Sequence, residues 1–479
     1  MKKRLNELFD TELEIEIEGI CTSSKDVKLG DLFFCIKGIN VDRHDYLDDA
    51  IARGAVAAVV SREIETSIPV IEVSNPNELV VPIAAKFYDY PYEKLRMIGI
   101  TGTDGKTSVA TIVRSLLNEF SKTGYIGTNG VSCDGYSEDS NNTTPTQEYT
   151  FKYLNSFIEH GCENACMEVS SEGLYYDRIQ PMKYDVSVFT NLTHEHLNTH
   201  GTMEAYFQQK AKLFENTKDD GACILNIDDN YYERFKEHCQ GKVITYGENS
   251  QADYYFFDVD LFKTKTSFKL NRNEMIYEIK SPLLGKFNVY NLVCSIATLE
   301  HLGYGIEQII PFFPKLRIDG RMNDIVLGQD FKVIVDYAHT PNGLKSLFSF
   351  TKELGAKRTI VVIGSAGERD SMKRPEMGEI VVSNADYTFF TMEDPRSEDP
   401  MDIINQLTSR VEHLSDKYEK IPDRKEAITK AIEFASKDDV VFILGKGNET
   451  YQKIGKEVIY FNDVEEAELA VNKRLKKTI

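Results

Sequence analysis

The sequence of residues 97–120, MIGITGTDGKTSVATIVRSLLNEF, carries the clearest indication of the fold class. The segment opens with the apolar run Met97-Ile98-Gly99-Ile100, which predicts a buried strand. Its second half places apolar residues at the spacing of one helix face, namely at Val109, Ile112, Val113, Leu116, Leu117 and Phe120. A strand, a glycine-rich loop and a helix in this order predict an α/β domain that binds phosphate.

The loop between the two elements is Gly102-Thr103-Asp104-Gly105-Lys106-Thr107. Glycines allow backbone N–H groups to close around phosphate oxygens, and the helix N-terminus adds its partial positive charge. Lys106 can reach the terminal phosphates of ATP, and the Thr107 hydroxyl can bind Mg²⁺. The full spacing of such loops has one more glycine at position 100, where this chain has Ile100. The alternative interpretation is a glycine-rich turn before a structural helix.

The composition of the chain restricts its class. Its 479 residues predict two to four domains, and a net charge of −20 argues against a general nucleic-acid binder. The N-terminal residues lack the apolar core of a signal peptide, and no apolar run is long enough to span a membrane. Eight scattered cysteines without a CxxC pattern indicate free thiols in a reducing compartment. We therefore expect a cytoplasmic protein.

The apolar pattern divides the chain into three blocks, residues 1–95, 96–316 and 317–479. The first block contains short apolar runs at 31–36 and 55–60, a helix-like segment at 47–53, and a linker at 88–93. In the second block, alternating apolar residues predict strands within 250–280. The third block has apolar runs at 333–335, 359–363, 387–390 and 440–444, separated by helix-like stretches, which predict a second and mostly parallel α/β sheet.

Further polar residues follow predicted strands of the middle block. Glu168 ends an apolar run, where a carboxylate near a phosphate loop suits Mg²⁺. The segment from Thr190 to Gly201 contains three histidines in an HxHxxxH pattern. Mg²⁺ binding by His196, a zinc site and a plain polar loop are the three interpretations of this pattern. Lys210 and Lys212 lie on a predicted helix, where lysines are usually solvated.

Together these motifs resemble the Mur ligase family, in particular its MurE branch, over nearly the whole chain. The resemblance rests on ordered motifs in all three blocks: residues 31–38, 44–46 and 50–55, the loop 102–107, 142–145, 191–206 with Lys210, 336–341, 367–375, 394–396 and 445–449. It implies three α/β domains: a small uridine-nucleotide-binding domain, a central ATPase-like domain with a parallel sheet, and a Rossmann-like C-terminal domain for the incoming amino acid.

The resemblance also implies an activity. ATP would phosphorylate the terminal carboxylate of UDP-N-acetylmuramoyl-L-alanyl-D-glutamate, and the amine of a diamino acid would attack the acyl phosphate during peptidoglycan precursor synthesis. ATP and Mg²⁺ are the implied cofactors. The implied partners are the two small-molecule substrates, without nucleic acid or membrane, and the implied state is a monomer.

By family position, each group of residues has an implied role. The catalytic and Mg²⁺-binding set is Lys106, Thr107, Glu168, His196 and Lys210, the last as a carbamate. The ATP-binding set is Gly102, Thr103, Asp104, Gly105, Lys106, Thr107, Ser108, Arg321, Asp336 and His339. The acceptor would be held by Ser24, Gly38, His44, Thr143, Thr144, Ser170 and Arg178. The amino-acid pocket would be formed by Arg369, Glu393, Asp394, Arg396, Gly445 and Glu449.

The pocket determines which amino acid is added. The planar guanidinium of Arg396 suits the distal carboxylate of meso-diaminopimelate, which L-lysine lacks. The chain has Asp394 where diaminopimelate enzymes of the family usually have Asn, however, and this added negative charge would favour a distal ammonium. Diaminopimelate is therefore the favoured substrate, and L-lysine and L-ornithine remain alternatives. An Asp-Pro-Arg turn at a helix start is the purely structural interpretation.

Other departures from the family pattern define two further alternatives. They are Glu195 and Asn198 for Asp, Glu172 for His, Asn448 for His, and Asp104 for Asn. A divergent Mur-like ligase with another acceptor, such as a pseudomurein-type enzyme, would also show them. A non-catalytic relative that binds nucleotide belongs to a different class, and the presence of Lys106, Glu168, His196 and Lys210 argues against it. A third interpretation is a folylpolyglutamate synthetase, which would share the middle domain. Such an enzyme would lack the first block, so residues 24–60 argue against it.

Overall fold

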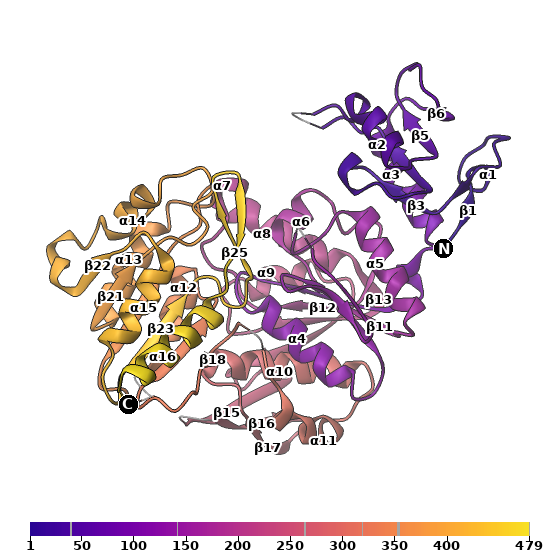
Figure 1. The fold of residues 1–479 in the computed structure, drawn as a ribbon. Coiled ribbons are helices and arrows are strands. Elements are labelled where there is room, and N and C mark those ends of the chain that lie inside the picture. The colour runs from indigo at the N-terminus through magenta and orange to yellow at the C-terminus, as the bar shows by residue number, and fades with distance from the viewer. Residues whose placement is uncertain (39–40, 141, 263–264, 319, 352–354, 479) are drawn as a thin grey trace. The chain divides into compact units, whose positions relative to one another are not determined.

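The computed structural model describes residues 1–38, 41–140, 142–262, 265–318, 320–351 and 355–478, and it is α/β in every part (Figure 1). It divides into two compact units, which comprise Met1–Ile98 with Ser121–Asp185, and Gly99–Phe120 with Val186–Ile479. Strands β7 (Arg96–Thr101) and β12 (Tyr184–Phe189) pass from one unit into the other. Within the described ranges, no helix is both long and apolar enough to cross a membrane.

The first unit begins with a four-stranded parallel sheet in the order β3-β4-β5-β6. Its strands are β3 (Gly19–Cys21), β4 (Asp31–Phe34), β5 (Ala57–Val60) and β6 (Val70–Glu72), and its helices are α2 (Leu47–Arg53) and α3 (Pro76–Phe87). Phe33, Leu47, Ala50 and Ala58 form part of its core because strand and helix each turn an apolar face inward. The strand predicted near 55–60 and the helix at 47–53 are confirmed, and the apolar run at 31–36 contains strand β4.

The same unit contains a second sheet region. Strand β11 (Asn164–Glu168) runs parallel to β8 (Thr123–Gly127), and β9 (Gly130–Cys133) and β10 (Tyr136–Glu138) continue antiparallel. Helix α5 (Gln147–Glu159) is anchored to the N-terminal residues by two hydrogen bonds, from the Thr22 hydroxyl to Glu148 (2.9 Å) and from the Tyr149 hydroxyl to Asp26 (2.8 Å). These contacts hold residues from the first and second predicted blocks in one compact unit.

The segment 88–93, which the sequence predicts as a linker, is partly buried. Pro91 begins a short 3₁₀ turn, η3 (Pro91–Glu93), and the Tyr92 ring is buried 5.5 Å from that of Phe151. Burial of an aromatic ring stabilises the packed conformation of this connection, which a pattern of turn residues does not reveal.

In the second unit, helix α4 (Lys106–Leu117) follows strand β7, as the sequence predicts. Five of the six apolar positions expected on its inner face are buried, and Phe120 instead follows the helix and stacks on Tyr304 at 4.5 Å. Helices α8 (Met203–Glu215) and α9 (Tyr232–Glu237) alternate with β13 (Thr217–Asn226) and β14 (Lys242–Gly247), and α10 (Lys286–His301) follows later in the chain. The strands predicted within 250–280 are the antiparallel β15 (Tyr254–Leu261), β16 (Thr266–Arg272) and β17 (Met275–Ser281).

The C-terminal part of the second unit has a sheet in the order β18-β19-β23-β20-β21-β22, parallel except for β18. The strands are β18 (Asn323–Asp324), β19 (Lys332–Asp336), β20 (Thr359–Ile363), β21 (Tyr387–Phe390), β22 (Tyr418–Lys420) and β23 (Val440–Leu444). The prediction of a mostly parallel sheet is thus confirmed.

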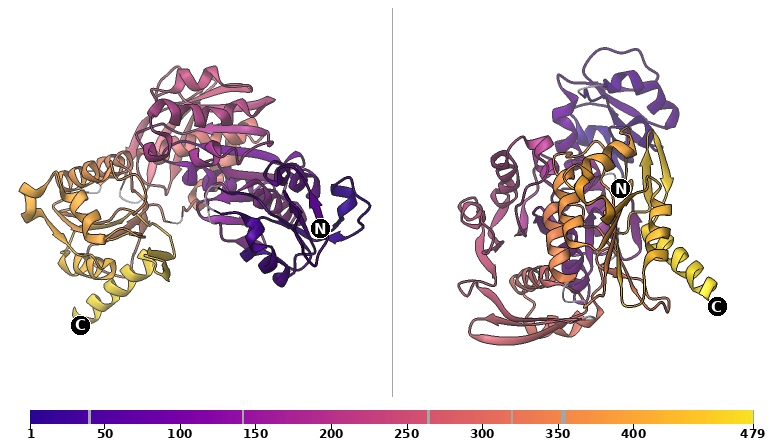
Figure 2. Two further views of the ribbon diagram at one scale, coloured as in Figure 1. Left: turned by 90° about the horizontal axis from the view of Figure 1, so that it is seen from above. Right: turned by 90° about the vertical axis from the view of Figure 1, so that its left-hand side faces the viewer.

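Helices cover both faces of this C-terminal sheet (Figure 1). On one face lie α12 (Pro341–Thr351), α13 (Arg374–Asn384) and α14 (Pro400–Thr408), and on the other α15 (Arg424–Phe434) and α16 (Asp463–Thr478). Alternate residues of each strand enter the two cores, such as Val361 on one side and Val362 on the other. Both views of Figure 2 show helix α16, in yellow, leading to the C-terminal end.

Candidate active site

The glycine-rich loop 102–105 is held in shape by the chain that follows strand β12. Thr103 N–H donates to the Asn191 carbonyl (2.8 Å), and Asp104 N–H donates to the Asn191 side-chain oxygen (3.0 Å). The Thr190 hydroxyl in turn donates to the Asp104 carbonyl at 2.7 Å. A Cβ at Gly102, where φ is +153°, would lie 1.8 Å from the Thr190 hydroxyl oxygen, so only glycine fits this approach.

Lys106, the first residue of helix α4, lies over this loop. Its ammonium donates to the carbonyls of Gly102 (2.9 Å) and Thr103 (2.8 Å). Thr107 and Ser108 follow, both buried in the first turn of the helix. A cation beside glycine-rich backbone at a helix N-terminus is the arrangement that binds phosphate groups.

Lys210 of helix α8 is buried, with an exposed fraction of only 1%. Its Nζ atom lies 2.8 Å from the Gly102 carbonyl oxygen and 4.8 Å from the centre of the Tyr206 ring. Burial, with the nearby positive charge of Lys106, lowers the pKa of Lys210 well below its usual value. The side chain is therefore a buried amine biased toward its neutral form, in contrast to the solvated lysine that a helix position alone suggests.

Two histidines in the same unit are also biased toward neutrality. Burial, together with the positive charges of Lys106, Lys210 and Lys373, lowers the pKa of His196 to about 2. Burial and the Lys373 charge lower the pKa of His339 to about 3, while its Nδ1 lies 2.8 Å from the Tyr337 carbonyl oxygen. A neutral imidazole is the form that binds a metal ion. Among the described residues, no three His, Cys, Asp or Glu side chains form a metal cluster.

Because the pKa values of His196 and His339 are low in the folded protein, we expect the protein to lose stability in acid. Below pH 6.5 the unfolded chain binds protons that His196 and His339 do not accept in the fold, so the free energy of unfolding falls as pH falls. The expected slope is up to about 1.4 kcal/mol per pH unit for each histidine. Urea unfolding at pH 7.5 and 5.5 should show a smaller pH effect for His196→Asn with His339→Gln than for the unchanged protein. His413→Asn, at an exposed position, is the control, and an equal effect in all three proteins would contradict the assignment.

Three polar contacts connect residues before position 317 to the C-terminal part of the second unit. The Asp104 carboxylate accepts hydrogen bonds from the Thr340 hydroxyl (3.1 Å) and the Asn342 amide (3.0 Å). Glu195 forms a buried ion pair with Lys373 at 2.8 Å. Asp104 and Glu195 are both positions where the sequence departs from the family pattern, and each has partners suited to its acidic side chain.

The other predicted ATP residues of this part lie close together. Asp336 ends strand β19 and accepts hydrogen bonds from the backbone N–H groups of Met322 and Ala338, both at 2.8 Å. The Arg321 guanidinium lies 4.4 Å from the centre of the Tyr337 ring, next in sequence to Asp336. The segments that carry Arg321, Asp336 and His339 are therefore joined by direct contacts.

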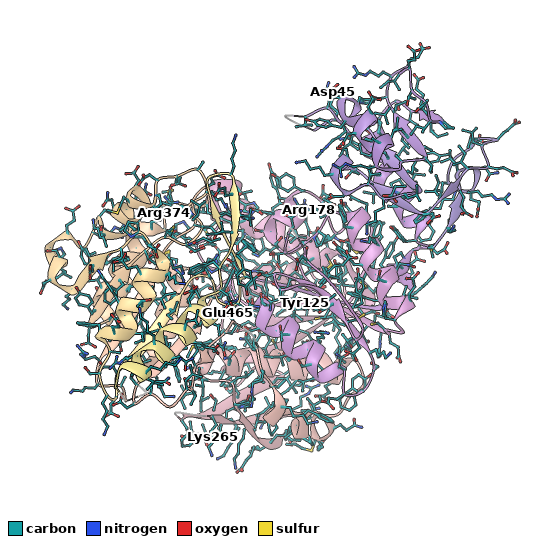
Figure 3. All side chains as sticks on the ribbon, viewed as in Figure 1. Asp45, Tyr125, Arg178, Lys265, Arg374 and Glu465 are labelled. Atoms are coloured by element: carbon teal, nitrogen blue, oxygen red, sulfur yellow. The ribbon has the colours of Figure 1, made fainter. Side chains whose placement is uncertain are left out.

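In the first unit, the predicted acceptor residues cluster around Glu168, which ends strand β11. Glu168 accepts hydrogen bonds from the Tyr125 hydroxyl (2.5 Å) and from the backbone N–H of Thr128 (3.0 Å). The Thr144 hydroxyl donates to the Glu168 carbonyl, and Arg178 donates to the Thr144 carbonyl at 3.0 Å. Ser170 N–H donates to the Thr144 hydroxyl oxygen, and the Thr143 and Thr128 hydroxyl oxygens lie 3.1 Å apart. Tyr125 and Arg178 are labelled in Figure 3.

Three of the residues predicted to hold the acceptor, His44, Ser24 and Gly38, lie in the N-terminal sheet region and differ in their surroundings. His44 is buried, with Nδ1 bonded to Asp42 (2.6 Å) and Nε2 accepting the Ser61 backbone N–H (3.0 Å). Both ring nitrogens are thus engaged within the fold. Ser24 is buried at the start of a 3₁₀ turn, and Gly38 N–H donates to the Val41 carbonyl.

All residues predicted for the amino-acid pocket lie in the C-terminal part of the second unit. Glu393 and Asp394 follow strand β21, whereas Gly445 and Glu449 follow β23. A Cβ on Gly445 would lie 3.1 Å from a Glu393 carboxylate oxygen. Burial, offset in part by Lys446, raises the pKa of Glu393 to about 7.

The two arginines predicted for the pocket lie on neighbouring loops. Arg396 donates from its guanidinium to the Gly367 carbonyl at 3.1 Å, and it has a positive φ of +52°. Arg369 is exposed. Nearby, the fully buried Arg374, labelled in Figure 3, binds Glu398 at 2.7 Å and the Ala366 carbonyl at 2.8 Å, which fixes the loop that carries Arg369.

Sequence reasoning missed four contributors to these sites. Tyr125 and Thr128 bind Glu168, Asn191 shapes the loop, and Lys446 binds two pocket carboxylates. Tyr125 and Thr128 lie about 40 residues before Glu168, and no local pattern connects them. Asn191 and Lys446 lie inside recognised motifs, so their position next to assigned residues was the available signal.

Three family models match successive parts of the chain. The Mur ligase family catalytic domain matches residues 16–94, the Mur ligase middle domain matches 100–299, and the Mur ligase glutamate ligase domain matches 320–447. The fold and these matches define an α/β protein built from three successive family domains.

The chain is similar to several ligases along nearly the whole length of both sequences. A UDP-N-acetylmuramoyl-L-alanyl-D-glutamate–2,6-diaminopimelate ligase from Halalkalibacterium halodurans is 39% identical over 464 residues, which cover 96% of this chain and 95% of the relative. The ligase of the same name from Geobacillus kaustophilus is 38% identical over 467 residues, which cover 96% of each chain. A solved structure of a ligase with this name superposes with a TM-score of 0.66 at 28% identity, over 99% of this chain and all of that one. The chain belongs to the Mur ligase family.

Proposed function

We propose that the protein is an ATP-dependent ligase that adds meso-diaminopimelate to UDP-N-acetylmuramoyl-L-alanyl-D-glutamate in peptidoglycan precursor synthesis. The full-length relatives carry this activity in their names, at 37–39% identity. The observation within the chain that carries the proposal is the buried Lys210 amine beside the Gly102 carbonyl, because an ATP loop alone does not require it.

The residues of the second unit provide what phosphoryl transfer requires. This reaction depends mainly on positioning and on stabilisation of charge at the transferred phosphoryl group. Lys106 supplies a cation at the loop, and the backbone from Gly102 to Gly105 is shaped by Thr190 and Asn191. These groups would hold the terminal phosphates of ATP next to the acceptor carboxylate. The carboxylate oxygen then attacks the γ-phosphorus, ADP leaves, and an acyl phosphate forms.

The predicted amino-acid pocket would bind the other substrate, the amino acid that is added. The α-amine of the amino acid attacks the acyl carbon and loses a proton, and the tetrahedral intermediate collapses to the amide with release of phosphate. Glu393, Asp394, Arg396 and Glu449 would hold the side chain of the amino acid during this step. The polar contacts of Asp104 and Glu195 keep the C-terminal part against the loop, which favours exclusion of water from the reactive acyl phosphate.

We further propose Mg²⁺ as the cofactor, because it prefers oxygen ligands such as hydroxyl, carboxylate and carbamate groups. The Thr107 hydroxyl, the neutral His196 ring, the Glu168 carboxylate and Lys210 as a carbamate are the ligands we propose. When bound, the ion would neutralise negative charge on the phosphates. The neutral amine of Lys210 can add to CO₂ and lose a proton, which converts a buried nitrogen into an anionic oxygen ligand. Tyr125 and Thr128 would orient Glu168 through their hydrogen bonds to its carboxylate.

We also propose a cellular compartment and an oligomeric state for the protein. All eight cysteines are free thiols, as expected for a reducing compartment, and the proposed substrates are nucleotides and amino acids of the cytoplasm. We therefore propose a cytoplasmic enzyme that acts as a monomer on these small molecules.

The test is phosphate release with ATP, Mg²⁺ and UDP-N-acetylmuramoyl-L-alanyl-D-glutamate in parallel reactions. These contain meso-diaminopimelate, L-lysine, L-ornithine or no amino acid. We expect release only with meso-diaminopimelate. Release with L-lysine or L-ornithine alone would replace the amino acid and retain the chemistry. Silence with all three, while ATP still binds, would contradict the proposal and favour another acceptor or a non-catalytic relative.

A further inference from the structure

A buried lysine without an assigned role lies between two carboxylates of the amino-acid pocket. The Lys446 ammonium is 2.8 Å from Asp394 Oδ1 and 2.7 Å from Glu449 Oε2. The Lys446 side chain is fully buried, and that of Asp394 is only 7% exposed. The Lys446–Asp394 pair is therefore shielded from water, whereas the Glu449 side chain is 20% exposed. A buried charge without a partner is strongly unfavourable.

The local backbone places Lys446 at this point. Residues 445–447 follow strand β23, and Gly445 and Gly447 have φ values of +113° and +55°, which glycine adopts without strain. Asp394 is held from a second direction by the Lys453 backbone N–H at 3.3 Å. Glu449 also accepts a hydrogen bond from the Tyr337 hydroxyl at 3.1 Å. The lysine and both carboxylates are thus fixed by neighbouring elements before any ligand binds.

The charges of the pocket are balanced by this arrangement. Glu393, Asp394 and Glu449 contribute up to three negative charges, and Lys446 compensates one of them from within the cluster. Burial raises the pKa of Glu393 to about 7, which reduces its average negative charge near neutral pH. Burial opposes the charge on Lys446, but Glu449, Asp394 and Glu393 raise its pKa, so the ammonium form is retained. The acidic residue at position 394 therefore adds little net charge to the pocket.

We infer that Lys446 is a positioning residue for amino-acid selection: by neutralising Asp394, it lets the pocket accept a side chain that ends in both an ammonium and a carboxylate. The inference rests on the proposed function. An uncompensated Asp394 would repel a distal carboxylate and attract a lone distal ammonium, as in L-lysine. With Lys446 in place, the negative charge of Asp394 is offset by the paired ammonium 2.8 Å away. Arg396 is then the cation that we assign to the distal carboxylate.

The experiment is a double-mutant cycle on Asp394 and Lys446 in the full chain. Steady-state kcat and KM are measured for meso-diaminopimelate, L-lysine and ATP in the unchanged enzyme, Asp394→Asn, Lys446→Met and the double variant. Lys446→Met should raise KM for meso-diaminopimelate about ten-fold or more and shift selectivity toward L-lysine, with KM for ATP nearly unchanged. The double variant should recover most of this loss, because the carboxylate is removed together with its counter-ion.

Two outcomes would overturn the inference. One is a double variant as impaired as Lys446→Met, which would mean that the lysine acts other than through Asp394. The other is unchanged selectivity in Lys446→Met. If Lys446→Met does not fold, Asp394→Asn and Lys446→Arg decide. The asparagine variant should keep or increase the preference for meso-diaminopimelate, the arginine variant should retain it, and a loss of preference in either would overturn the inference.

The unchanged enzyme distinguishes a failure of the proposed function from a failure of the role assigned to Lys446. Release of phosphate that depends on meso-diaminopimelate supports the proposed function, and the variants then test only Lys446. An unchanged enzyme that is silent with every amino acid overturns both the proposed function and the inference that rests on it.

Discussion

Lys106→Ala should abolish phosphate release in the complete reaction, with a fall in kcat of about a thousand-fold or more. The Lys106 ammonium is the cation that lies over the loop carbonyls of Gly102 and Thr103. Without it, the developing charge on the transferred phosphoryl group would lose its nearest stabilising side chain. The measurement is initial rate with saturating ATP, Mg²⁺, acceptor and meso-diaminopimelate.

Two further variants of the enzyme serve as controls for this result. Lys106→Met retains the aliphatic length of the side chain without its charge and should be as inactive as the alanine variant. Lys315→Ala removes a lysine whose side chain is 68% exposed and should retain nearly full activity. Phosphate release by Lys106→Ala at the rate of the unchanged enzyme would show that the loop does not bind ATP in the proposed way.

Lys210→Ala should reduce kcat about a hundred-fold or more, and short carboxylates such as formate or acetate should restore part of the activity. The alanine variant leaves a space beside the Gly102 carbonyl and Tyr206 where a small anion can replace the carbamate oxygens. Activity is measured against carboxylate concentration. In parallel, the unchanged enzyme is exposed to ¹³C-labelled bicarbonate and examined by NMR for a carbamate carbon.

Lys212→Ala is the matched control, since Lys212 is only two residues away on the same helix α8 and is less deeply buried. It should stay close to the activity of the unchanged enzyme, with no response to carboxylates. A Lys210→Ala variant that is fully active without rescue would rule out the carbamate. Absence of a labelled carbamate signal in the active enzyme would lead to the same conclusion.

The sequence predicts the elements of the fold well where one local pattern determines them. Helix α4 and strand β7 flank a glycine-rich loop, and the apolar runs of the C-terminal part become β19, β20, β21 and β23. No local pattern predicts the contacts that join segments far apart in the sequence. Tyr92 packs on Phe151, and the Tyr149 hydroxyl binds Asp26, 123 residues away, so the first and second blocks share a unit that no boundary signal indicates.

The site shows the same contrast. Family position assigns Thr144, Ser170 and Arg178 to one group, and in the first unit these residues contact one another or the Glu168 backbone. The state of a side chain depends on its tertiary surroundings, however. Nothing in the local sequence indicates that Lys210 is buried or that both ring nitrogens of His44 are engaged. Asp394 is an instructive case, because its charge suggested a lysine-type pocket until its pairing with Lys446, 52 residues away, was considered.

The hydrogen bonds of Asp104 to Thr340 and Asn342, and the Glu195–Lys373 ion pair, also constrain how parts of this enzyme can be exchanged. Each contact joins a residue before position 317 to one after it. A chimaera that fuses residues 1–316 to the C-terminal part of a relative would therefore leave two acidic side chains without their donors, unless those three positions were transplanted as well. Recombination between family members should consequently succeed most often when these five residues are inherited together.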